Sequence, residues 1–484
     1  MTSDIPVEMD QPIPQIALDE RARNRLVIGL LLASAFVMIL NETIMGVALP
    51  HLMKDLGISA NAAQWLTTAF LLTMAVVIPI TGYLLERFHT RPVFIAALSL
   101  FSLGTLLGAL APGFPMLVVA RVIQACGTAI VMPLLMTTVM RLVPPETRGR
   151  TMGSISIVIS VAPAIGPTIS GIILSALDWR WLFWLVLPIA VLALGAGVWR
   201  IRNVSTPRPA PLDILSVGLS ALGFGGLVYG LSILGAGRAE GALSPWLPVI
   251  IGTLALVIFV VRQIRLQRHD KALLDLRTFL SPSFTIALLV LAISMMALFG
   301  SLILLPIYMQ NVLGLSVLQT GMMLLPGGLA MGLAAPVVGR LFDRYGPTPL
   351  VLPGALMVSA VMWAMALLDQ TTPTALVLAG HVVLSIGLSL MFTPLFTSAL
   401  GSLPARLYSH GSATIGTIQQ VAGAAGTALF VALMSMQMAR LSGTGADMVA
   451  ATASGVQIAF LCGGIISTLA VIAAVFVRRP KYVA

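Results

Sequence analysis

The chain has 484 residues, of which 58% are hydrophobic and only 9% are charged. Its mean hydropathy of +1.01 lies far outside the range of soluble globular proteins. The net charge of +10 does not indicate nucleic-acid binding, because the basic residues are scattered in short loops between apolar segments. The composition therefore excludes a soluble protein and predicts an integral membrane protein.

The apolar segments have the length of helices that cross a bilayer, since about 20 residues rising 1.5 Å each span roughly 30 Å. No alternation with a period of two is sustained, so the pattern favours an all-α polytopic protein over a β-barrel. Fourteen transmembrane helices are predicted, at 26–49, 64–85, 93–111, 116–140, 151–176, 182–199, 214–235, 246–261, 284–308, 318–341, 350–368, 374–397, 411–438 and 454–477.

Most of the 27 Lys and Arg residues lie on the side of these spans that also carries the N-terminus. The exceptions are Lys54, Arg180, Arg238 and Arg440 on the other side, and Arg121 within a span. By the positive-inside rule, both termini are expected to be cytoplasmic. The first 20 residues are Pro-rich and acidic and do not resemble a signal peptide.

The chain contains an internal repeat. The sequence from Ile78 to Phe88 matches that from Ala335 to Tyr345 at a constant separation of 257 positions. Because these stretches end the second and the tenth spans, two six-helix halves are expected to flank two inserted helices. The predicted units are a disordered cytoplasmic tail (1–25), a first half (26–200), a linker with the two inserted helices and a basic cytoplasmic loop (201–282), a second half (283–477) and a cytoplasmic tail (478–484).

Glu42 is an acid deep inside an apolar span, roughly 12 Å from its outer end. A charge in hydrocarbon costs several kcal/mol, about 2.5–3.5 on insertion scales, so such a residue indicates a functional site. Arg121 lies at a similar depth in the fourth span, and His381, at a separation of 260, occupies the matching place in the twelfth. Glu42 is expected to carry a transported proton, with a structural bridge to Arg121 as the alternative.

Four elements resemble signatures of the major facilitator superfamily. They are Gly82 to Arg91 (cytoplasmic loop), Arg121 to Gly127 (fourth span), Ala162 to Gly171 (fifth span, typical of antiporters) and Leu40 to Pro50 (first span, typical of fourteen-helix drug:proton antiporters). The Asn41-Glu42 pair is similar to the lincomycin-resistance-type branch, although the family's Asp stands where this chain has Asn41. The resemblance implies the major facilitator fold, in which the first and fourth helices line one cavity.

Site residues follow from these motifs and from residue chemistry. The expected proton-coupling group is Glu42, Arg121 and His381. The expected gating residues, an acid before an Arg repeated in both halves, are Gly82, Glu86, Arg87, Arg91, Gly339, Asp343 and Arg344. The expected antiporter helix bend comprises Pro163, Gly166, Pro167 and Gly171. Substrate contacts are expected from Met38, Asn41, Gln124, Met295, Tyr308, Gln310, Asn311, Met391, Gln419 and Gln420.

Other readings of these residues stay open. Arg121 and His381 are also explained as residues that join neighbouring helices, the gating residues as ordinary positive-inside charges, and the Gly and Pro residues as close packing. The histidines His51, His89, His269 and His410 lie at loops or span ends, where no special role is expected. No metal site and no cofactor other than the proton gradient are expected.

The sequence predicts a proton-coupled antiporter of the bacterial cytoplasmic membrane that exports lipophilic, cationic compounds. Its expected partners are small lipophilic substrates, protons and membrane lipids, and a monomer is expected. A transporter of another cargo, such as a metabolite, siderophore or lipid, is the alternative. A membrane sensor or an intramembrane enzyme fits less well, because the sequence has no HExxH or GxSxG motif and no carboxylate pair within the spans.

Overall fold

The computed structural model describes residues 15–201, 203, 206–207, 211–236, 244, 246–443 and 447–479. Within these ranges, 14 helices are long and apolar enough to cross a membrane, which confirms the predicted number. A helix satisfies its backbone polar groups internally, as hydrocarbon requires. The helices are α1 (Gln15–Leu56), α2 (Ala60–Arg87), α3 (Thr90–Ala109), α4 (Phe114–Leu142), η1 (Pro145–Thr147), α5 (Arg148–Ala176), α6 (Arg180–Arg200), α7 (Ile214–Ala236), α8 (Trp246–Leu266), η2 (Gln267–His269), η3 (Leu276–Leu280), α9 (Pro282–Asn311), α10 (Val317–Tyr345), α11 (Thr348–Met365), α12 (Thr374–Gly401), η4 (Ala405–Leu407), α13 (Tyr408–Ser442) and α14 (Met448–Ala474).

The start of α1 differs from the sequence-based expectation. Residues 1–25 are predicted to form a disordered tail, but α1 begins at Gln15, and residues 1–14 lie outside the described residues. Between Ile16 and Arg25 the sequence contains Ala, Leu, Glu and Arg, which are strong helix formers, and no Gly or Pro. Local helix propensity therefore extends the first span into the polar segment that precedes it.

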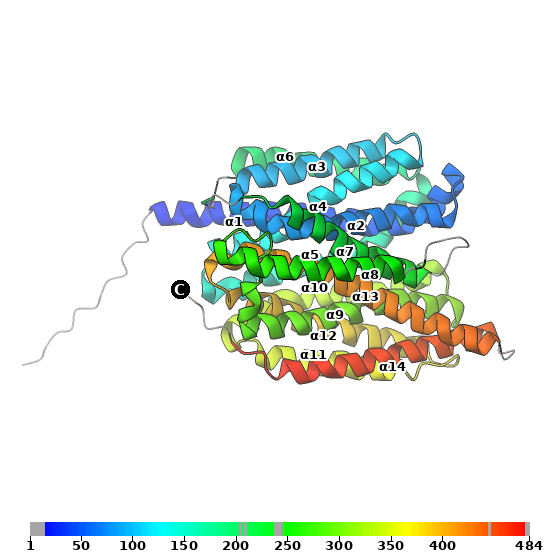
Figure 1. Cartoon of the computed structure of the whole chain (residues 1–484). Helices are drawn as coiled ribbons and strands as arrows, with labels where there is room; N and C mark the ends of the chain where they lie inside the picture. Colours follow the sequence, from blue (N-terminus) through cyan, green and yellow to red (C-terminus); the bar gives the residue numbers. More distant parts are fainter. Residues whose placement is uncertain are drawn as a thin grey trace, which may run out of the picture.

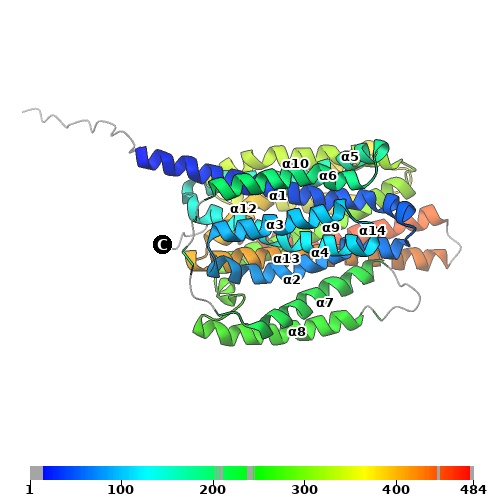
Figure 2. The ribbon, with the colours of Figure 1, turned by 90° about the horizontal axis from the view of Figure 1, so that it is seen from above.

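The two predicted halves are visible in the helix packing. In the first half α1 packs on α5, α3 on α4 and α2 on α4, and in the second half α9 packs on α13, α11 on α12 and α10 on α12. Adding eight to each helix number in the first set gives the second set, as expected for six-helix halves separated by two inserted helices. The packing therefore confirms the duplication. Figure 1 shows the halves as two layers, and both described ends of the chain lie at the same end of the bundle (Figures 1 and 2). This end, called the terminal end below, is the one that the positive-inside rule assigns to the cytoplasm.

In the described residues, the halves are joined mainly by four pairs of α-helices: α5 with α10, α2 with α13, α4 with α13, and α5 with α12. The hydrogen bonds and ion pairs between the described parts of the halves lie in the portion of the bundle nearer the terminal end. The outermost of them joins Gln420 Nε2 to Met74 Sδ at 3.8 Å, about midway along α2. The halves are therefore locked together at the terminal end.

The inserted helices α7 and α8 form a hairpin on one side of the bundle (Figure 2). α7 packs on α2 and α13, and α8 packs on α7. The outer face of α8 exposes apolar side chains, including Ile250, Leu254, Val257, Ile258 and Val261, as a lipid-facing helix does. The hairpin thus covers the α2–α13 contact, whereas the equivalent α5–α10 contact lies on the opposite side of the molecule (Figure 2).

An ion pair at the terminal end ties the hairpin together. Arg262 of α8 donates from Nε and Nη2 to the carboxylate of Asp213, which immediately precedes α7, at 2.7 and 2.8 Å. The same carboxylate accepts from the backbone N–H of Ser216, so it also caps α7. The hydrogen bonds from Arg262 lower the pKa of Asp213 from its usual range to about 2.

Replacing Asp213 by Asn is expected to destabilise the protein by on the order of 1 kcal/mol, because the pair is partly exposed. The folded pKa of about 2 lies below the unfolded value of about 4. The contribution is therefore fully present above about pH 5 and is lost as the pH falls toward 2. Thermal unfolding in detergent should show a difference in Tm between the two proteins at pH 5–8 that shrinks below pH 4.

Asp447→Asn is the matched control, because Asp447 also precedes a helix, is exposed and makes no side-chain cap hydrogen bond. Its Tm should equal that of the unmodified protein. An Asp213→Asn difference in Tm that does not change between pH 7 and pH 3 would contradict the role assigned to the ion pair.

Candidate functional site

Glu42 lies within α1, where it follows the buried Asn41 and is itself only partly exposed. Successive helical residues differ by about 100° in direction, so the two side chains leave α1 on different faces. Glu42 and Arg121 of α4 act on each other electrostatically. Among the described residues, however, no cationic nitrogen lies within 4.0 Å of the Glu42 carboxylate. The bridge to Arg121, which was the alternative to the proton-carrier role, is therefore not formed as a direct contact in this structure.

The packing of α1 on α5 fixes the position of the segment around Glu42. Thr43 donates from its hydroxyl to the carbonyl of Leu40 at 2.9 Å, and Ser170 of α5 donates to the carbonyl of Ile44 at 3.1 Å. A Cβ atom placed on Gly166 would lie 2.2 Å from Thr43 Oγ1. The small residue in the antiporter-like element of α5 thus allows α1 to approach beside the acid.

Arg121 is buried, and its guanidinium joins three helices. Its Nε donates to the carbonyl of Leu66 in α2 at 3.3 Å, and the group lies 4.0 Å from the ring centroid of Phe70. Its Nη1 donates to Gln124, whose amide donates to Thr105 of α3 at 2.9 Å. Arg121 therefore joins neighbouring helices, while its charge is held within electrostatic range of Glu42.

His381 holds the corresponding place in the second half. Its Nε2 donates to the carbonyl of Leu324 in α10 at 3.1 Å, just as Arg121 donates to Leu66 in α2. A Cβ on Gly327 would lie 2.4 Å from the imidazole, so the ring packs directly on the backbone of α10. The structure brings Glu42 and Arg121 into one site and engages His381 with α10. The proton-relay role of His381 stays a prediction.

The predicted gating acids both contact the opposite half. The Asp343 carboxylate accepts from the backbone N–H groups of Gly149 and Arg150 at 2.7 and 2.9 Å, and so caps the start of α5. Close packing supports this contact, because a Cβ on Gly339 would lie 2.3 Å from the carbonyl oxygen of Gly149. The acid at the end of α10 is thus held by unpaired donors at the start of α5.

Glu86 makes the equivalent contact from α2 to α13. A carboxylate oxygen of Glu86 lies 3.2 Å from Nε2 of His410, and His410 is buried. The sequence indicates no special role for His410, but its ring contacts an acid of the other half, and the pair is ionic only when the imidazole is protonated. His410 lies near the end of a span, and its partner comes from the other half of the chain. Its position in the sequence therefore does not reveal the contact.

The basic residues of the gating group remain within their own halves. Arg91 donates to the carbonyl of Val198 at 2.7 Å, Arg344 lies over the ring of Tyr345, and Arg87 is exposed. Arg148, at the start of α5, lies near Tyr408 at the start of α13, with 3.5 Å between Nη1 and the hydroxyl oxygen. Hydrogen bonds between Thr137 and Ser412 and between Ser156 and Thr393 add to this cross-half contact.

The motifs of the sequence do not predict these additional contacts, although the sequence contains a signal for them. The segment from Val143 to Gly153 corresponds to that from Leu403 to Ala413 at a separation of 260, and Pro144 and Pro404 each precede a short 3-10 turn. Extending the repeat to this loop would have paired Arg150 with His410. The signal is weak because the loop sequences differ at most positions.

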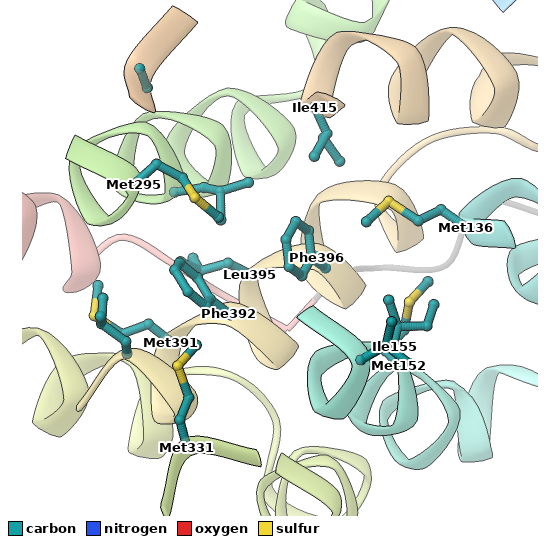
Figure 3. Packing of buried hydrophobic residues seen from close by; sticks show 14 of the residues in the cluster. Met136, Met152, Ile155, Met295, Met331, Met391, Phe392, Leu395, Phe396 and Ile415 are labelled. Atoms are coloured by element: carbon teal, nitrogen blue, oxygen red, sulfur yellow. The ribbon is translucent and has the colours of Figure 1, made fainter. Parts of the chain in front are cut away.

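Four of the predicted substrate-contact residues, Met38, Met295, Tyr308 and Met391, belong to a buried apolar cluster that includes residues of both halves. Figure 3 shows Met295 and Met391 with Met136, Met152, Phe392 and Phe396 on helices of both halves. Met38 and Tyr308 are also buried, and Gln124 and Tyr308 use their polar groups in hydrogen bonds with protein partners. Gln310, Gln419 and Gln420 are partly exposed and Asn311 is exposed. A ligand-binding role for this group stays a prediction, as does the bend at Pro163 and Pro167 within the continuous helix α5.

Gly166→Ala is expected to lower the Tm, because the added methyl group must displace Thr43, and overpacking of this kind costs about 1–3 kcal/mol. Gly171→Ala is the matched control on the same helix, where an added Cβ meets no atom within 4 Å. The double variant Gly166→Ala with Thr43→Ala should recover most of the loss. Equal Tm values for the two single Gly variants would show that α1 does not need the space at Gly166.

Comparison with known proteins places this arrangement in a family. The model of the Major Facilitator Superfamily matches residues 31–427. The chain is 41% identical over 460 residues to the lincomycin resistance protein LmrB of Listeria monocytogenes, covering 94% of this chain and 97% of that protein. It is 39% identical over 466 residues to the uncharacterised MFS-type transporter YcnB of Bacillus subtilis, covering 96% and 98%.

The fold agrees with this assignment. The crystal structure of the human organic anion transporter MFSD10 superposes with a TM-score of 0.68 at 16% identity, covering 93% of this chain and 99% of that one. Its sequence is too distant to indicate a shared substrate, so the likeness concerns the fold alone. The duplicated six-helix halves, the paired contacts at the terminal end and the matches along almost the whole sequence lead to one conclusion: this chain belongs to the Major Facilitator Superfamily.

Proposed function

We propose that this protein is a proton-coupled efflux antiporter of a bacterial cytoplasmic membrane that exports lipophilic, cationic compounds by alternating access. The observation that carries the proposal is Glu42, an acid inside a membrane span whose charge interacts with that of Arg121 but which, among the described residues, has no cationic nitrogen within 4.0 Å. Such a group is free to exchange a proton or to meet a cation. The lincomycin resistance protein LmrB, at 41% identity, supports export of a drug-like compound.

The proposed cycle uses one carboxyl group for two competing cargoes. With a proton, Glu42 is neutral, which removes the cost of a charge at this depth. Without it, the carboxylate attracts a cationic substrate, while the buried guanidinium of Arg121 keeps the proton exchangeable by opposing its uptake. Proton entry from outside would then release the substrate, and substrate entry from the cytoplasm would release the proton.

The locked terminal end corresponds in this proposal to the state closed toward the cytoplasm. In the cluster of Figure 3, Met136 and Met152 belong to the first half and Met295, Met331 and Met391 to the second, so the two groups would separate when that end opens. Flexible thioether side chains can then repack around apolar compounds of different shape. Transport of another cargo, such as a metabolite, siderophore or lipid, is the alternative, and the family's fold accommodates it.

Glu42→Gln should abolish substrate-driven proton movement, reducing it at least tenfold, because the amide cannot titrate. The measurement is the change in lumenal pH when a cationic dye is added to proteoliposomes containing the purified transporter. Glu146→Gln is the control, since Glu146 is an exposed acid in the loop that precedes α5. Full coupling in the Glu42→Gln protein would disprove the proton-carrier role.

Asp343→Asn and Glu86→Gln should each open the terminal end. Loss of a charge-assisted hydrogen bond worth about 1.5 kcal/mol shifts the closed-to-open ratio roughly tenfold. Spin-label distances between α2 and α13 at the terminal end report this ratio, after Cys126 and Cys462 are replaced by Ser.

Asp369→Asn is the control for these measurements, because the Asp369 carboxylate bonds only Thr371 and Thr372 within its own loop. Its closed-to-open ratio should match that of the unmodified protein. If transport and distances were unchanged in both Asp343→Asn and Glu86→Gln, the contacts would have no gating role.

A further inference from the structure

The two contacts that lock the terminal end occupy equivalent places but use different chemistry. From α10, Asp343 binds the backbone N–H groups of Gly149 and Arg150, which are permanent donors. From α2, Glu86 reaches the side chain of His410 at 3.2 Å. Histidine is the side chain whose ordinary charge change falls between pH 5 and 8. One lock therefore depends on permanent donors, and the other on a side chain whose charge depends on protonation.

The His410 ring is built into the contact between the halves. A Cβ on Gly82 would lie 3.0 Å from its Nδ1, so the bare backbone of α2 provides the space that the ring occupies. Glu86 is one helical turn further along α2 and meets the other ring nitrogen. The His410 side chain is 5% exposed, whereas Glu86 is 21% exposed and is reached by water. Separation of α2 from α13 would therefore remove the partner of His410 and expose the ring.

Few other charges face this ring. On α4, Arg141 donates to Ser409, and on α5, Arg148 lies against Tyr408. Arg406 is in η4, and Asp213 beside α7 is paired with Arg262 of α8. α9, α7 and α14 contain no Asp, Glu, Lys, Arg or His, and on α12 only His381 belongs to these types. Glu86 is thus the acid that the structure places against His410.

We propose that His410 is a cytoplasmic pH sensor that controls closure of the transporter's inner side. When protonated, the imidazolium forms a charge-assisted ion pair with Glu86, which exists only while the halves are closed. The closed state therefore binds this proton more tightly than the open state. The closed fraction rises as the cytoplasmic pH falls and decreases as it rises.

The unpaired second nitrogen keeps this lock reversible. Nδ1 of His410 is buried and has no hydrogen-bond partner in the part of the chain that the structure describes. Protonation places an N–H there that has no acceptor, which offsets part of the gain from the ion pair. The inference rests on the proposed alternating access but not on the proton-carrier role of Glu42.

The test measures the closed-to-open ratio from spin-label distances between α2 and α13 in lipid nanodiscs from pH 5.5 to 8. All proteins carry Glu42→Gln, so that the proposed proton carrier cannot contribute to the pH dependence. In this background the ratio should rise by about tenfold as the pH falls. His410→Gln should favour the open state, and His410→Arg, which keeps a positive charge opposite Glu86 at every pH of the experiment, should favour the closed state. Both variants should lose the pH dependence.

His269→Gln is the matched control, because His269 is an exposed histidine in η2. It should retain the full pH response, and Glu86→Gln should lose it. The proposal is overturned if the Glu42→Gln background shows no pH response, or if His410→Gln keeps it. A second measurement tests the proposed function separately: substrate-driven proton movement by a His410→Arg protein that keeps Glu42. Its result is independent of the spin-label distances, so failure of the pH sensor and failure of the proposed function can be told apart.

Discussion

The closed arrangement of this transporter depends on acids that end the second helix of each half and meet the start of the fifth helix of the other. A helix start offers backbone donors without intrahelical partners and a partial positive charge. Asp343 satisfies two of these donors at α5, and Glu86 reaches His410 near the start of α13. The close approach of Gly149 to Gly339, and of Gly82 to His410, makes both contacts possible. Removal of either acid would leave buried polar groups on the opposite half without partners.

The duplicated halves use the same backbone contacts with different side chains. Arg121 and His381 each donate to a backbone carbonyl of the second helix of their half, at Leu66 and Leu324. Arg121 also lies on the ring of Phe70, whereas His381 packs on Gly327, which lacks a side chain. The first half thus holds a permanent positive charge within electrostatic range of Glu42, and the second half holds a group that is neutral in its ordinary state near pH 7. At this pair of equivalent positions, the permanently charged side chain therefore lies in the first half, which also contains Glu42.

The sequence predicts the membrane class, the fourteen helices and the duplication, because these follow from span length and from motifs within a few residues of each other. It also identifies Glu42 and the acids Glu86 and Asp343, whose chemistry is costly or repeated. It does not identify His410, Tyr408 or Ser412, because their roles come from partners in the other half. Nor does it predict that Gln124 is fully engaged by Arg121 and Thr105, since a polar residue within a span looks the same whether it faces a cavity or a neighbouring helix. Contacts between distant segments are set by packing, which local patterns do not encode.

The inserted hairpin makes the two contacts between the halves unequal. α7 lies along α2 and α13, with Trp65 and Tyr229 in ring contact at 5.6 Å and a Cβ on Gly225 within 3.3 Å of Val76. Opening of the α2–α13 contact therefore requires α7 to move with one half or to slide along both, whereas the α5–α10 contact has no such cover (Figure 2). The lock that uses the His410 side chain lies on the covered side, and the lock that uses backbone donors lies on the uncovered side. In the proposal made above, protonation of His410 thus acts on the contact that α7 must also accommodate when the halves separate.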